Sequence, residues 1–315
     1  MVSLLPVLSA AYFLDLLIGD PQVWFHPIRF LGKTIEWGEK CFRFLFTSEL
    51  FGGLLFAIVI PSAVFFSSYF VIHKLSSISA VLSAAFEIVL VYASLSTKDL
   101  AVESRWVRNA LLKGELKVAK EKLSWIVGRE TKNLNEKGMI RAVVETIAES
   151  TVDGIIAPLF YAFLGGAPLA MTYKAINTLD SMIGHRNERY IQFGKSAAAI
   201  DRWVNWIPAR LAGIFIPLAA LLSGNSFKKS LKFAWRDGLK SKVPNAGIPE
   251  GALAGALGVQ LGGVNFYDGV AIETDLLGDP IHPLSLDKID RSIQILYVTS
   301  MLFFSVGIGI RLILI

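Results

Sequence analysis

The sequence predicts an all-α, polytopic helical integral membrane protein with amphipathic cytoplasmic helices and at least one broken or re-entrant helix. The chain of 315 residues is 53% hydrophobic and 18% charged, with a mean hydropathy of +0.53, whereas soluble domains are nearer a quarter charged. Its apolar residues also gather in long blocks, and roughly 20 consecutive apolar residues can cross a bilayer. No stretch alternates convincingly as a strand, and helices satisfy their own backbone in lipid.

Six segments are candidate spans. Four meet or approach the required length, and these are Gly53–Ile72, Ile78–Ser96, Trp206–Ser223 and Ser292–Ile310. The N-terminal segment Val2–Ile18 is slightly short and lacks a basic start, so we interpret it as a retained anchor or an imperfect first span. The sixth, Ile155–Tyr173, is apolar but interrupted by Pro158, Gly165–Gly166 and Pro168.

Basic residues predict which loops are cytoplasmic. Asp20–Gly52 holds four, Thr97–Arg141 eleven and Asn225–Glu250 six, whereas the short link His73–Ser77 has a single lysine and is predicted outside. If Ile155–Tyr173 and Trp206–Ser223 both cross fully, residues 174–205 lie outside. If Ile155–Tyr173 is re-entrant or interfacial, they stay inside. Broken backbone at membrane depth needs cover from protein or a water-filled cavity, and we favour the re-entrant alternative.

These segments predict one membrane-embedded domain, 1–315, in a cell membrane. It comprises N-terminal spans (1–96), a cytoplasmic helical segment (97–150), a motif-bearing core (151–267) and a C-terminal loop and span (268–315). Within the cytoplasmic segment, Asp99–Leu123 has the apolar spacing of one amphipathic helix.

Composition excludes several kinds of site. The single cysteine, Cys41, rules out an intramolecular disulfide framework, and the four histidines lack H-E-x-x-H spacing. The net charge of +5 suits anionic lipid head groups or anionic ligands. The basic residues sit in interspan loops, so the charge does not indicate nucleic acid. Gly194-Lys195-Ser196 resembles the end of a P-loop, but position 189 is arginine where that motif needs glycine, so any nucleotide needs a different site.

The first polar stripe consists of Arg141, Glu145, Glu149 and Asp153, each four residues from the next. On a helix such spacing keeps side chains on one face. Carboxylates stacked in this way are tolerated when they face water, pair with arginines or hold a hard cation such as Mg²⁺. A solvated face is the simpler interpretation. The stripe runs into the apolar segment 155–173, however, and unpaired carboxylates are costly at a membrane boundary.

A second polar stripe follows the broken segment. It includes Lys174, Asn177 and Asp180, and the string His185-Arg186-Asn187-Glu188-Arg189 comes next. Guanidinium groups match the oxygens of phosphate, although a salt-bridged loop explains the same string. Arg210 lies within an apolar run, where an ionisable group is a candidate functional residue.

Three further features complete the pattern. Pro244–Glu250 is predicted to be a stiff loop with two prolines. Ala254, Gly258 and Gly262 recur every four residues, which is typical of a close helix-packing face. The tripeptide G-D-P occurs at 19–21 and 278–280, each time followed by H-P. This repeated motif, the G-D-P echo, has two explanations: two turn-forming tripeptides that coincide by chance, or two loops that present Asp and His to one site.

Long blocks of the sequence resemble one family. They are G-R-E-T at 128–131, R-A-V-V-E-T-I-A-E-S-T-V-D-G-I-I-A-P-L-F-Y at 141–161, G-G-A-P at 165–168, Y-K-A-I-N-T-L-D-S-M-I-G-H-R-N-E-R-Y at 173–190, N-W-I-P-A-R at 205–210 and P-N-A-G-I-P-E at 244–250. The chain resembles the adenosylcobinamide-phosphate synthase family, the CobD/CbiB type of cobalamin biosynthesis membrane protein. The resemblance runs from D-L-L-I-G-D-P at 15–21 to about 267.

The resemblance implies an ATP-dependent acid–amine ligase. The free propionate of its corrinoid substrate, adenosylcobyric acid, would be joined to (R)-1-aminopropan-2-ol O-phosphate or a related amino alcohol. The product is adenosylcobinamide phosphate, and an acyl phosphate is the expected intermediate. ATP and Mg²⁺ are the expected cofactors. The lipid bilayer, other membrane enzymes of cobalamin biosynthesis and a second copy of the chain are the expected partners.

Residue types suggest roles within that reaction. The candidate catalytic carboxylates are Glu145, Glu149, Asp153 and Asp180, of which Glu145, Glu149 and Asp153 are also candidate Mg²⁺ ligands. The candidate substrate- and phosphate-binding residues are Arg129, Lys174, Asn177, Arg186, Asn187, Arg189, Arg210, Asn245 and Glu250. The sequence departs from the family pattern at Ser150, usually asparagine, and at Ser241-Lys242-Val243, where the family usually has His-x-Ser.

Two other classes of function remain open from the sequence. A transporter or channel would explain the spans, the broken helix and Arg210, although transporters usually show repeated halves. A non-catalytic scaffold for corrinoid enzymes would also be membrane-bound. It would not need so many acids, amides and arginines in one region.

Overall fold

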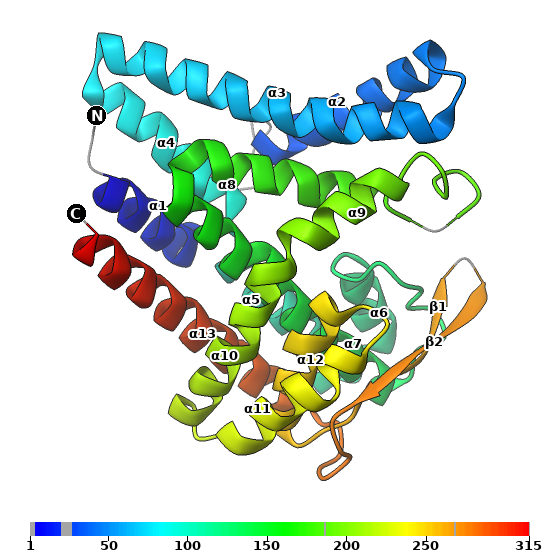
Figure 1. Cartoon of the computed structure of the whole chain (residues 1–315). Helices are drawn as coiled ribbons and strands as arrows, with labels where there is room; N and C mark the ends of the chain where they lie inside the picture. The colour runs from blue at the N-terminus through cyan, green and yellow to red at the C-terminus, as the bar shows by residue number, and fades with distance from the viewer. Residues whose placement is uncertain (1–3, 20–26, 186, 268, 315) are drawn as a thin grey trace. The chain divides into compact units, whose positions relative to one another are not determined.

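The computed structural model describes residues 4–19, 27–185, 187–267 and 269–314, and most of them are helical (Figure 1). The helices before the broken segment are α1 (Leu4–Ile18), α2 (Pro27–Leu45), α3 (Glu49–Ile78), α4 (Ala80–Ser94), α5 (Thr97–Leu112), α6 (Leu116–Ser124) and α7 (Glu136–Thr151). After it come α8 (Ala157–Ile183), α9 (Lys195–Val204), α10 (Trp206–Leu222), α11 (Phe227–Arg236), α12 (Pro244–Leu257) and α13 (Leu286–Ile313). The predicted all-α class is confirmed, with one small hairpin, β1 (Leu261–Tyr267) and β2 (Val270–Leu277), as the exception.

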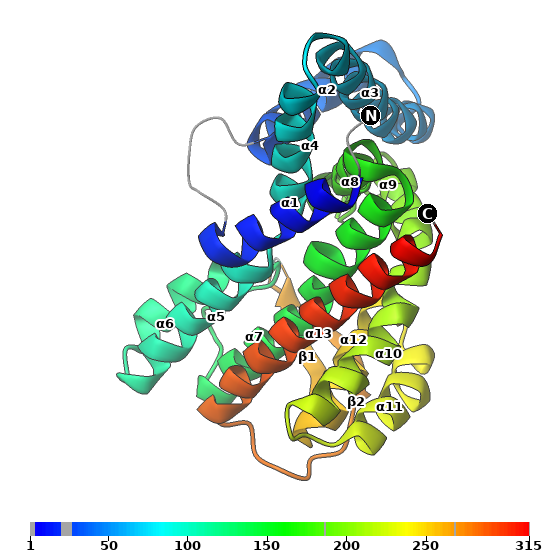
Figure 2. The same cartoon turned by 90° about the vertical axis from the view of Figure 1, so that its left-hand side faces the viewer.

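The chain forms two compact units. The first comprises Met1–Ser96, Ala157–Trp206 and Gly307–Ile315, and the second comprises Thr97–Ile156 and Ile207–Val306. In the first unit α3 and α4 pack against α8, and α1 packs against α4 (Figure 2). In the second, α12 packs against α11 and α7, and α5 and α6 pack against α7.

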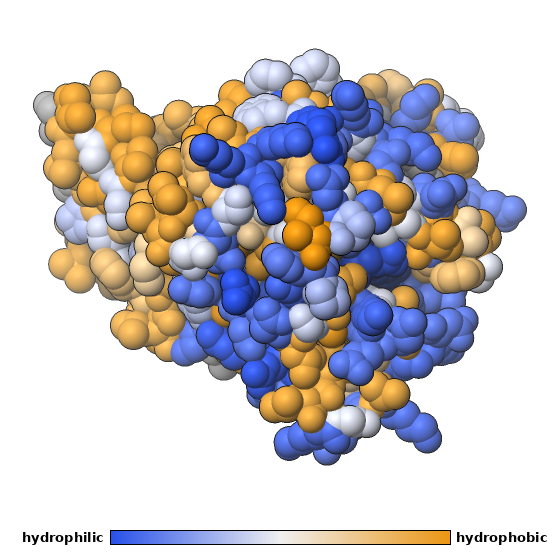
Figure 3. Space-filling model, turned by 90° about the horizontal axis from the view of Figure 1, so that it is seen from below, coloured by the Kyte–Doolittle hydropathy of each residue, from blue (hydrophilic) through white to orange (hydrophobic). Residues whose placement is uncertain are grey.

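Among the residues that the structure describes, four helical stretches are long and apolar enough to cross a membrane: Glu49–Ile78, Ala80–Leu112, Glu136–Ile183 and Leu286–Ile313. A fifth candidate is the pair α9 and α10, bent by 45°. These stretches cover the predicted spans after the N-terminal segment, and α1 is apolar but shorter. Large apolar side chains are exposed on α3 and α4, for example Phe66 and Val81. On the face shown in Figure 3, hydrophilic side chains gather at the centre and hydrophobic ones cover the left-hand side. Both kinds of surface are expected of a membrane protein with a water-facing part.

The predicted broken helix is confirmed. A turn of π-helix, Val152–Ile156, separates α7 from α8. Within α8 the backbone leaves helical geometry at Gly165 and at Gly166, where φ is +67° and ψ is −158°. Pro168 follows and has no N–H to extend the earlier turn. Glycine tolerates the positive φ that this break requires.

Two helix boundaries differ from prediction. The expected single helix at Asp99–Leu123 is two helices, because Gly114 has a φ of +75° and interrupts them. The expected link His73–Ser77 is helical. Ser79 alone joins α3 to α4, and its hydroxyl accepts from the Leu82 N–H at the start of α4.

The segment 244–267 was also wrongly predicted. Pro244–Glu250 is the first half of α12 rather than a loop, because Pro244 occupies N1, where a missing N–H costs nothing. Gly258 ends α12 in the left-handed conformation and Gly262 lies in β1. Ala254, Gly258 and Gly262 therefore do not share a helix face. The strands pair antiparallel, with Asn265 opposite Ile272.

Candidate functional site

The side chain of Glu145 is the centre of a buried polar cluster in the second unit. It lies on α7, whose first turn is capped by Asn135 accepting from the Gly138 N–H at 2.8 Å. Glu145 is only 7% exposed. Its Oε2 accepts a hydrogen bond from Arg129 Nη2, and its Oε1 accepts from the Gly262 N–H at 2.7 Å. Arg141 Nε lies 3.7 Å from Oε1. A carboxylate buried in this way is stabilised by two cations and a backbone donor.

Asn265 is the second acceptor of the cluster, and it comes from β1. Its side chain is buried, and Oδ1 accepts from Arg129 Nη1 at 2.5 Å and from Arg141 Nη2 at 2.7 Å. Arg141 also donates to the carbonyl oxygens of Gly262 and Val264. The two guanidinium groups are thus fixed between α7 and the hairpin.

The G-R-E-T segment is held against the same hairpin. The Glu130 N–H donates to the Phe266 carbonyl at 2.9 Å, and Glu130 Oε1 accepts from the Gly269 N–H. Gly262 has a φ of +84°, and a Cβ there would lie 2.0 Å from the Asp275 carbonyl oxygen. Only glycine therefore lets β1 bring its N–H to Glu145.

Glu250 adds a third carboxylate to this region. Burial raises its pKa well above the ordinary 4.5, and the charges of Glu145 and Glu149 raise it further, against the opposing effect of Arg129 and Arg141. Burial likewise raises the pKa of the Tyr267 hydroxyl. A carboxyl group with a raised pKa exchanges protons closer to neutral pH than an ordinary one, which suits a general base or acid.

The remaining candidates of the second unit have different settings. Glu149 is exposed on α7, and Asp153 lies in the π-helical turn, partly buried. Arg210 Nη1 donates to Asn245 Oδ1 at 2.8 Å, so two residues predicted separately as ligand-binding form one pair between α10 and α12. That pair gives the arginine of an apolar helix a polar partner.

The other candidates belong to the first unit. Lys174, Asn177 and Asp180 lie on α8, and Arg186 lies outside the described residues. Asn187 Oδ1 accepts from the Tyr190 N–H at 3.1 Å and so stabilises its own loop. A Cβ on Gly184 would lie 1.9 Å from Asp180 Oδ1, so glycine is needed beside that carboxylate.

Arg189 is engaged by Glu39, a residue that sequence reasoning did not select. Glu39 is 5% exposed and accepts from Arg189 Nη2 at 3.0 Å and from Arg43 Nε at 2.9 Å. The Tyr190 hydroxyl donates to its other oxygen at 3.3 Å. Arg189 therefore has a structural role in holding the loop to α2.

Within the described ranges, no group of three or more His, Cys, Asp or Glu side chains is arranged to hold an ion. The predicted Mg²⁺ ligands Glu145, Glu149 and Asp153 are not such a group. Both oxygens of Glu145 accept hydrogen bonds, one from Arg129 and one from the Gly262 N–H.

Two elements of the site were not foreseen. Asn265 and Tyr267 belong to the hairpin, which was not predicted. The G-D-P echo is only partly described: residues 20–26 of its first copy lie outside the described residues. In its second copy the Gly278 N–H donates to Asp237 Oδ2, and Asp279 pairs with Arg236 at 3.1 Å.

Comparison with known proteins identifies the family. The family model described as CobD/Cbib protein matches residues 8–296. A cobalamin biosynthesis protein CobD from Klebsiella pneumoniae is 40% identical over 305 residues, covering 96% of this chain and 95% of the relative. One from Geobacter metallireducens is 42% identical, covering 92% of each chain. Cobalamin biosynthesis protein CbiB of Salmonella typhimurium is 40% identical, covering 96% of this chain and 95% of the relative. No solved structure matches significantly. The chain therefore belongs to the CobD/CbiB family of cobalamin biosynthesis proteins.

Proposed function

We propose that this protein is an ATP-dependent amide ligase of cobalamin biosynthesis. It joins the free propionate of adenosylcobyric acid to the amine of (R)-1-aminopropan-2-ol O-phosphate or a related amino alcohol. Family membership supports the pathway. The observation that carries the chemistry is the cluster in which Arg129 and Arg141 are fixed beside Glu145 while Glu250 has a raised pKa.

The reaction needs an activated carboxylate. The propionate oxygen attacks the γ-phosphorus of ATP, the bond from that phosphorus to ADP breaks, and an acyl phosphate forms. The amine then attacks the acyl carbon, and inorganic phosphate leaves with the electron pair of the broken C–O bond. Both steps build negative charge on phosphate oxygens, which guanidinium groups stabilise.

Arg129 and Arg141 supply that stabilisation. A guanidinium has five N–H donors, and Glu145 and Asn265 engage only one Nη atom of Arg129 each. The proposal therefore requires the other N–H donors of Arg129 to reach phosphate oxygens through the 8% of its side chain that is exposed. Glu145 and Asn265 act as positioning residues, because they fix the planes of both guanidinium groups.

Glu250 takes the proton that the amine must lose. An ammonium group is not a nucleophile, so one proton must leave before or during attack on the acyl phosphate. The raised pKa of Glu250 brings its proton affinity nearer to that of the amine than an ordinary carboxylate's would be. ATP enters as its Mg²⁺ complex, a co-substrate, and Mg²⁺ bound to phosphates needs only one or two protein carboxylates. The candidates are Glu149, which is exposed, and Asp153, which is partly buried.

The site faces the cytoplasm in this proposal. The segments that carry it lie next to Thr97–Arg141 and Asn225–Glu250, which are rich in lysine and arginine. The cytoplasm also supplies ATP.

Purified protein supplied with adenosylcobyric acid, aminopropanol phosphate and Mg-ATP tests the proposal. We expect ADP and adenosylcobinamide phosphate to form in equal amounts, and neither to form when any one substrate is omitted. ATP hydrolysis without amide formation, or movement of a corrinoid across proteoliposomes without any new amide, would favour a transporter. Corrinoid binding with no product in detergent or in liposomes would favour a scaffold.

A further inference from the structure

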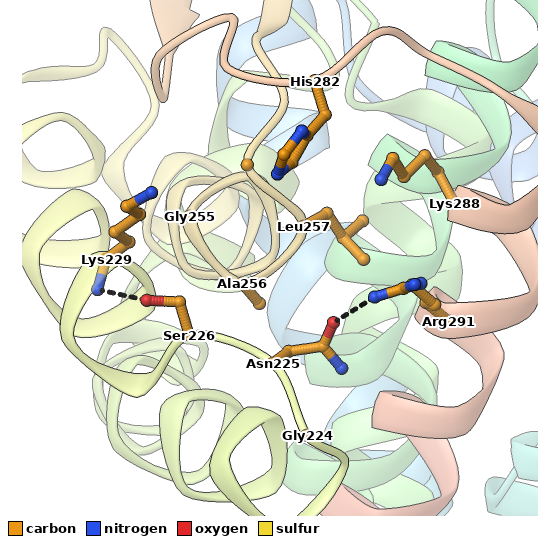
Figure 4. Close-up of a pocket in the computed structure, with 11 residues that line it drawn as sticks. Gly224, Asn225, Ser226, Lys229, Gly255, Ala256, Leu257, His282, Lys288 and Arg291 are labelled. Atoms are coloured by element: carbon orange, nitrogen blue, oxygen red, sulfur yellow. Dashed lines mark hydrogen bonds between the residues drawn. The ribbon is translucent and has the colours of Figure 1, made fainter.

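A basic pocket lies in the second unit, lined by residues that the proposed reaction does not use. Its volume is about 370 Å³, and it lies where the start of α11, the end of α12 and the start of α13 meet (Figure 4). The polar residues that line it are Asn225, Ser226, Lys229, His282, Lys288 and Arg291. All of them belong to the second unit.

The lining carries three permanent positive charges and no carboxylate. Lys288 is only 7% exposed, and Figure 4 shows its ammonium group turned toward the space beside His282 and Leu257. The carboxylate recorded beside it is that of Asp287, which lies 3.4 Å from Lys288 Nζ and 3.5 Å from Arg291 Nε but does not line the pocket. A lysine buried so deeply is costly unless an anion compensates its charge.

The backbone adds to this preference. Ser226, the N-cap of α11, and Lys288, in the first turn of α13, both line the pocket, so two helices begin beside it. The N-terminal ends of helices favour anions. The C-terminal end of α12 opposes them, but its partial charge is smaller than that of the three side-chain cations.

His282 is held in place over the end of α12. The backbone N–H of His282 donates to the Gly258 carbonyl at 2.8 Å. A Cβ on Gly258, whose φ is +65°, would lie 2.7 Å from the ring carbon Cδ2. Only glycine at position 258 leaves room for the ring of His282. The imidazole of the second H-P motif therefore lies in the pocket wall.

We propose that this pocket binds the phosphate group of a small phosphate ester. The pocket offers three cations, an imidazole and a hydroxyl, which is more than a ligand with a single carboxylate could engage. A phosphate group has several charged oxygens and can accept hydrogen bonds from more of these groups. The volume is close to the lower end for small-molecule sites, which leaves room for a short group beyond the phosphate.

Two sources can supply that chemistry. One is a soluble phosphate ester. The other is an anionic lipid head group, because α13 is a candidate span that begins here and α10 is half of another that ends here. Basic pockets at the ends of spans are typical lipid head-group sites.

The test compares wild type with Lys229→Gln/Arg291→Gln, which removes two exposed cations and leaves buried Lys288 to maintain the fold. Lys228→Gln is the matched control, since Lys228 is exposed on the same helix but does not line the pocket. Circular dichroism and thermal unfolding in detergent confirm that each variant is folded. One arm measures binding of aminopropanol phosphate and of inorganic phosphate by calorimetry. The other measures binding of short-chain phosphatidylglycerol against phosphatidylcholine in detergent micelles.

We expect the double variant to bind at least about tenfold more weakly than wild type in one arm. The reason is that losing even one charge-assisted hydrogen bond weakens binding by roughly tenfold. Lys228→Gln should bind as wild type does. Loss in the first arm assigns a soluble ester, and loss in the second assigns a lipid. If the double variant and Lys228→Gln retain wild-type affinity in both arms, or if wild type binds neither class, the proposal is wrong. Aminopropanol phosphate is also the amine substrate of the proposed ligase, so its binding to wild type alone does not assign the pocket. The comparison of the double variant with Lys228→Gln does, because Lys229 and Arg291 line this pocket and are not part of the Glu145 cluster.

Discussion

Arg129 and Glu145 form an ion pair in which both side chains are almost completely enclosed, with 8% and 9% of their surfaces exposed. They are 16 positions apart in the sequence. The pair joins the loop before α7 to that helix, and the Gly262 N–H extends the contact to the hairpin. A pair of this kind is favourable only while both partners are present, because a lone buried charge is costly.

Replacing Glu145 should therefore destabilise the fold. Glu145→Ala leaves Arg129 without its carboxylate, and we expect the free energy of unfolding to fall by about 3 kcal/mol. Asp290→Ala is the matched control, since Asp290 pairs with Arg108 in the same unit but is 47% exposed. Its cost should stay below about 1 kcal/mol. Denaturant unfolding in one detergent measures the free energy of unfolding of both variants. Equal losses in the two variants would show that the Arg129–Glu145 pair does not stabilise the fold more than an exposed ion pair does.

The glycine of the hairpin offers a geometric prediction. Gly262→Ala places a Cβ against the Asp275 carbonyl, whereas Gly269→Ala has a similar φ of +77° but meets nothing within 4 Å. Both variants carry the left-handed strain of about 1–2 kcal/mol. We expect Gly262→Ala to cost at least about 2 kcal/mol more, because β1 must shift away from Glu145. Thermal unfolding compares the two, and equal melting temperatures would contradict the contact.

Stability should depend on pH through Glu250. Its pKa is raised in the folded protein, so the folded state binds this proton more tightly than the unfolded chain does. The contribution of Glu250 is therefore fully favourable below the ordinary value of 4.5, and it is lost as pH rises through the folded pKa. Glu250→Gln should be more stable relative to wild type at higher pH. Parallel stability–pH curves for the two proteins would exclude a raised pKa.

The same group should shape the pH dependence of catalysis. In our proposal Glu250 acts as a base, so kcat/KM rises as it loses its proton. Glu250→Gln should lower the rate by roughly 10²–10⁴ and remove that rise. Glu121→Gln, on exposed α6 of the same unit, is the control and should leave the profile unchanged. A Glu250→Gln enzyme with the wild-type profile would remove Glu250 from the proton transfer.

Asn265 provides a test of positioning. Asn265→Asp keeps the acceptor for Arg129 and Arg141 but adds a negative charge near the cluster that already raises the pKa of Glu250. We expect the ascending limb of kcat/KM to move to higher pH in this variant. Asn265→Leu should lose at least about tenfold in kcat/KM, because the guanidinium groups lose their acceptor. An unmoved limb in Asn265→Asp would show that the residue has only a structural role.

Much of the fold was predictable because membrane spans have a strong local signal. The blocks 53–72, 78–96 and 292–310 are apolar over the length that a bilayer requires. Helices contain the first and the third, and α4 covers most of the second. Gly165–Gly166 also marked the break in α8 correctly, since glycine and Pro168 both interrupt helical hydrogen bonding. These signals come from neighbouring residues and do not depend on the fold.

The hairpin was missed although a local signal existed. D-G at 268–269 stands between runs rich in β-branched and aromatic residues, which is typical of a two-residue hairpin. The rule that membrane-spanning backbone is helical does not apply to this hairpin, which lies outside the candidate spans. Pro244–Glu250 was assigned to a loop because it holds two prolines, yet proline at N1 is compatible with a helix.

The candidate site was predictable only in part. Residue type selected Arg129, Glu145 and Glu250, which the structure brings into one unit. The spacing of Arg141, Glu145 and Glu149 placed them correctly on one helix. The acceptor shared by the two arginines, Asn265, could not be found from spacing, because it lies more than a hundred residues away and on a strand. Contacts of that range depend on the tertiary fold.

Transfer of an isotope from substrate to phosphate tests the proposed reaction most directly. Adenosylcobyric acid labelled with ¹⁸O in its free propionate is incubated with the protein, aminopropanol phosphate and Mg-ATP. If the propionate attacks the γ-phosphorus, one labelled oxygen must leave in the inorganic phosphate and the other must remain in the amide. Phosphate that contains only unlabelled oxygen, despite amide formation, would contradict activation through an acyl phosphate.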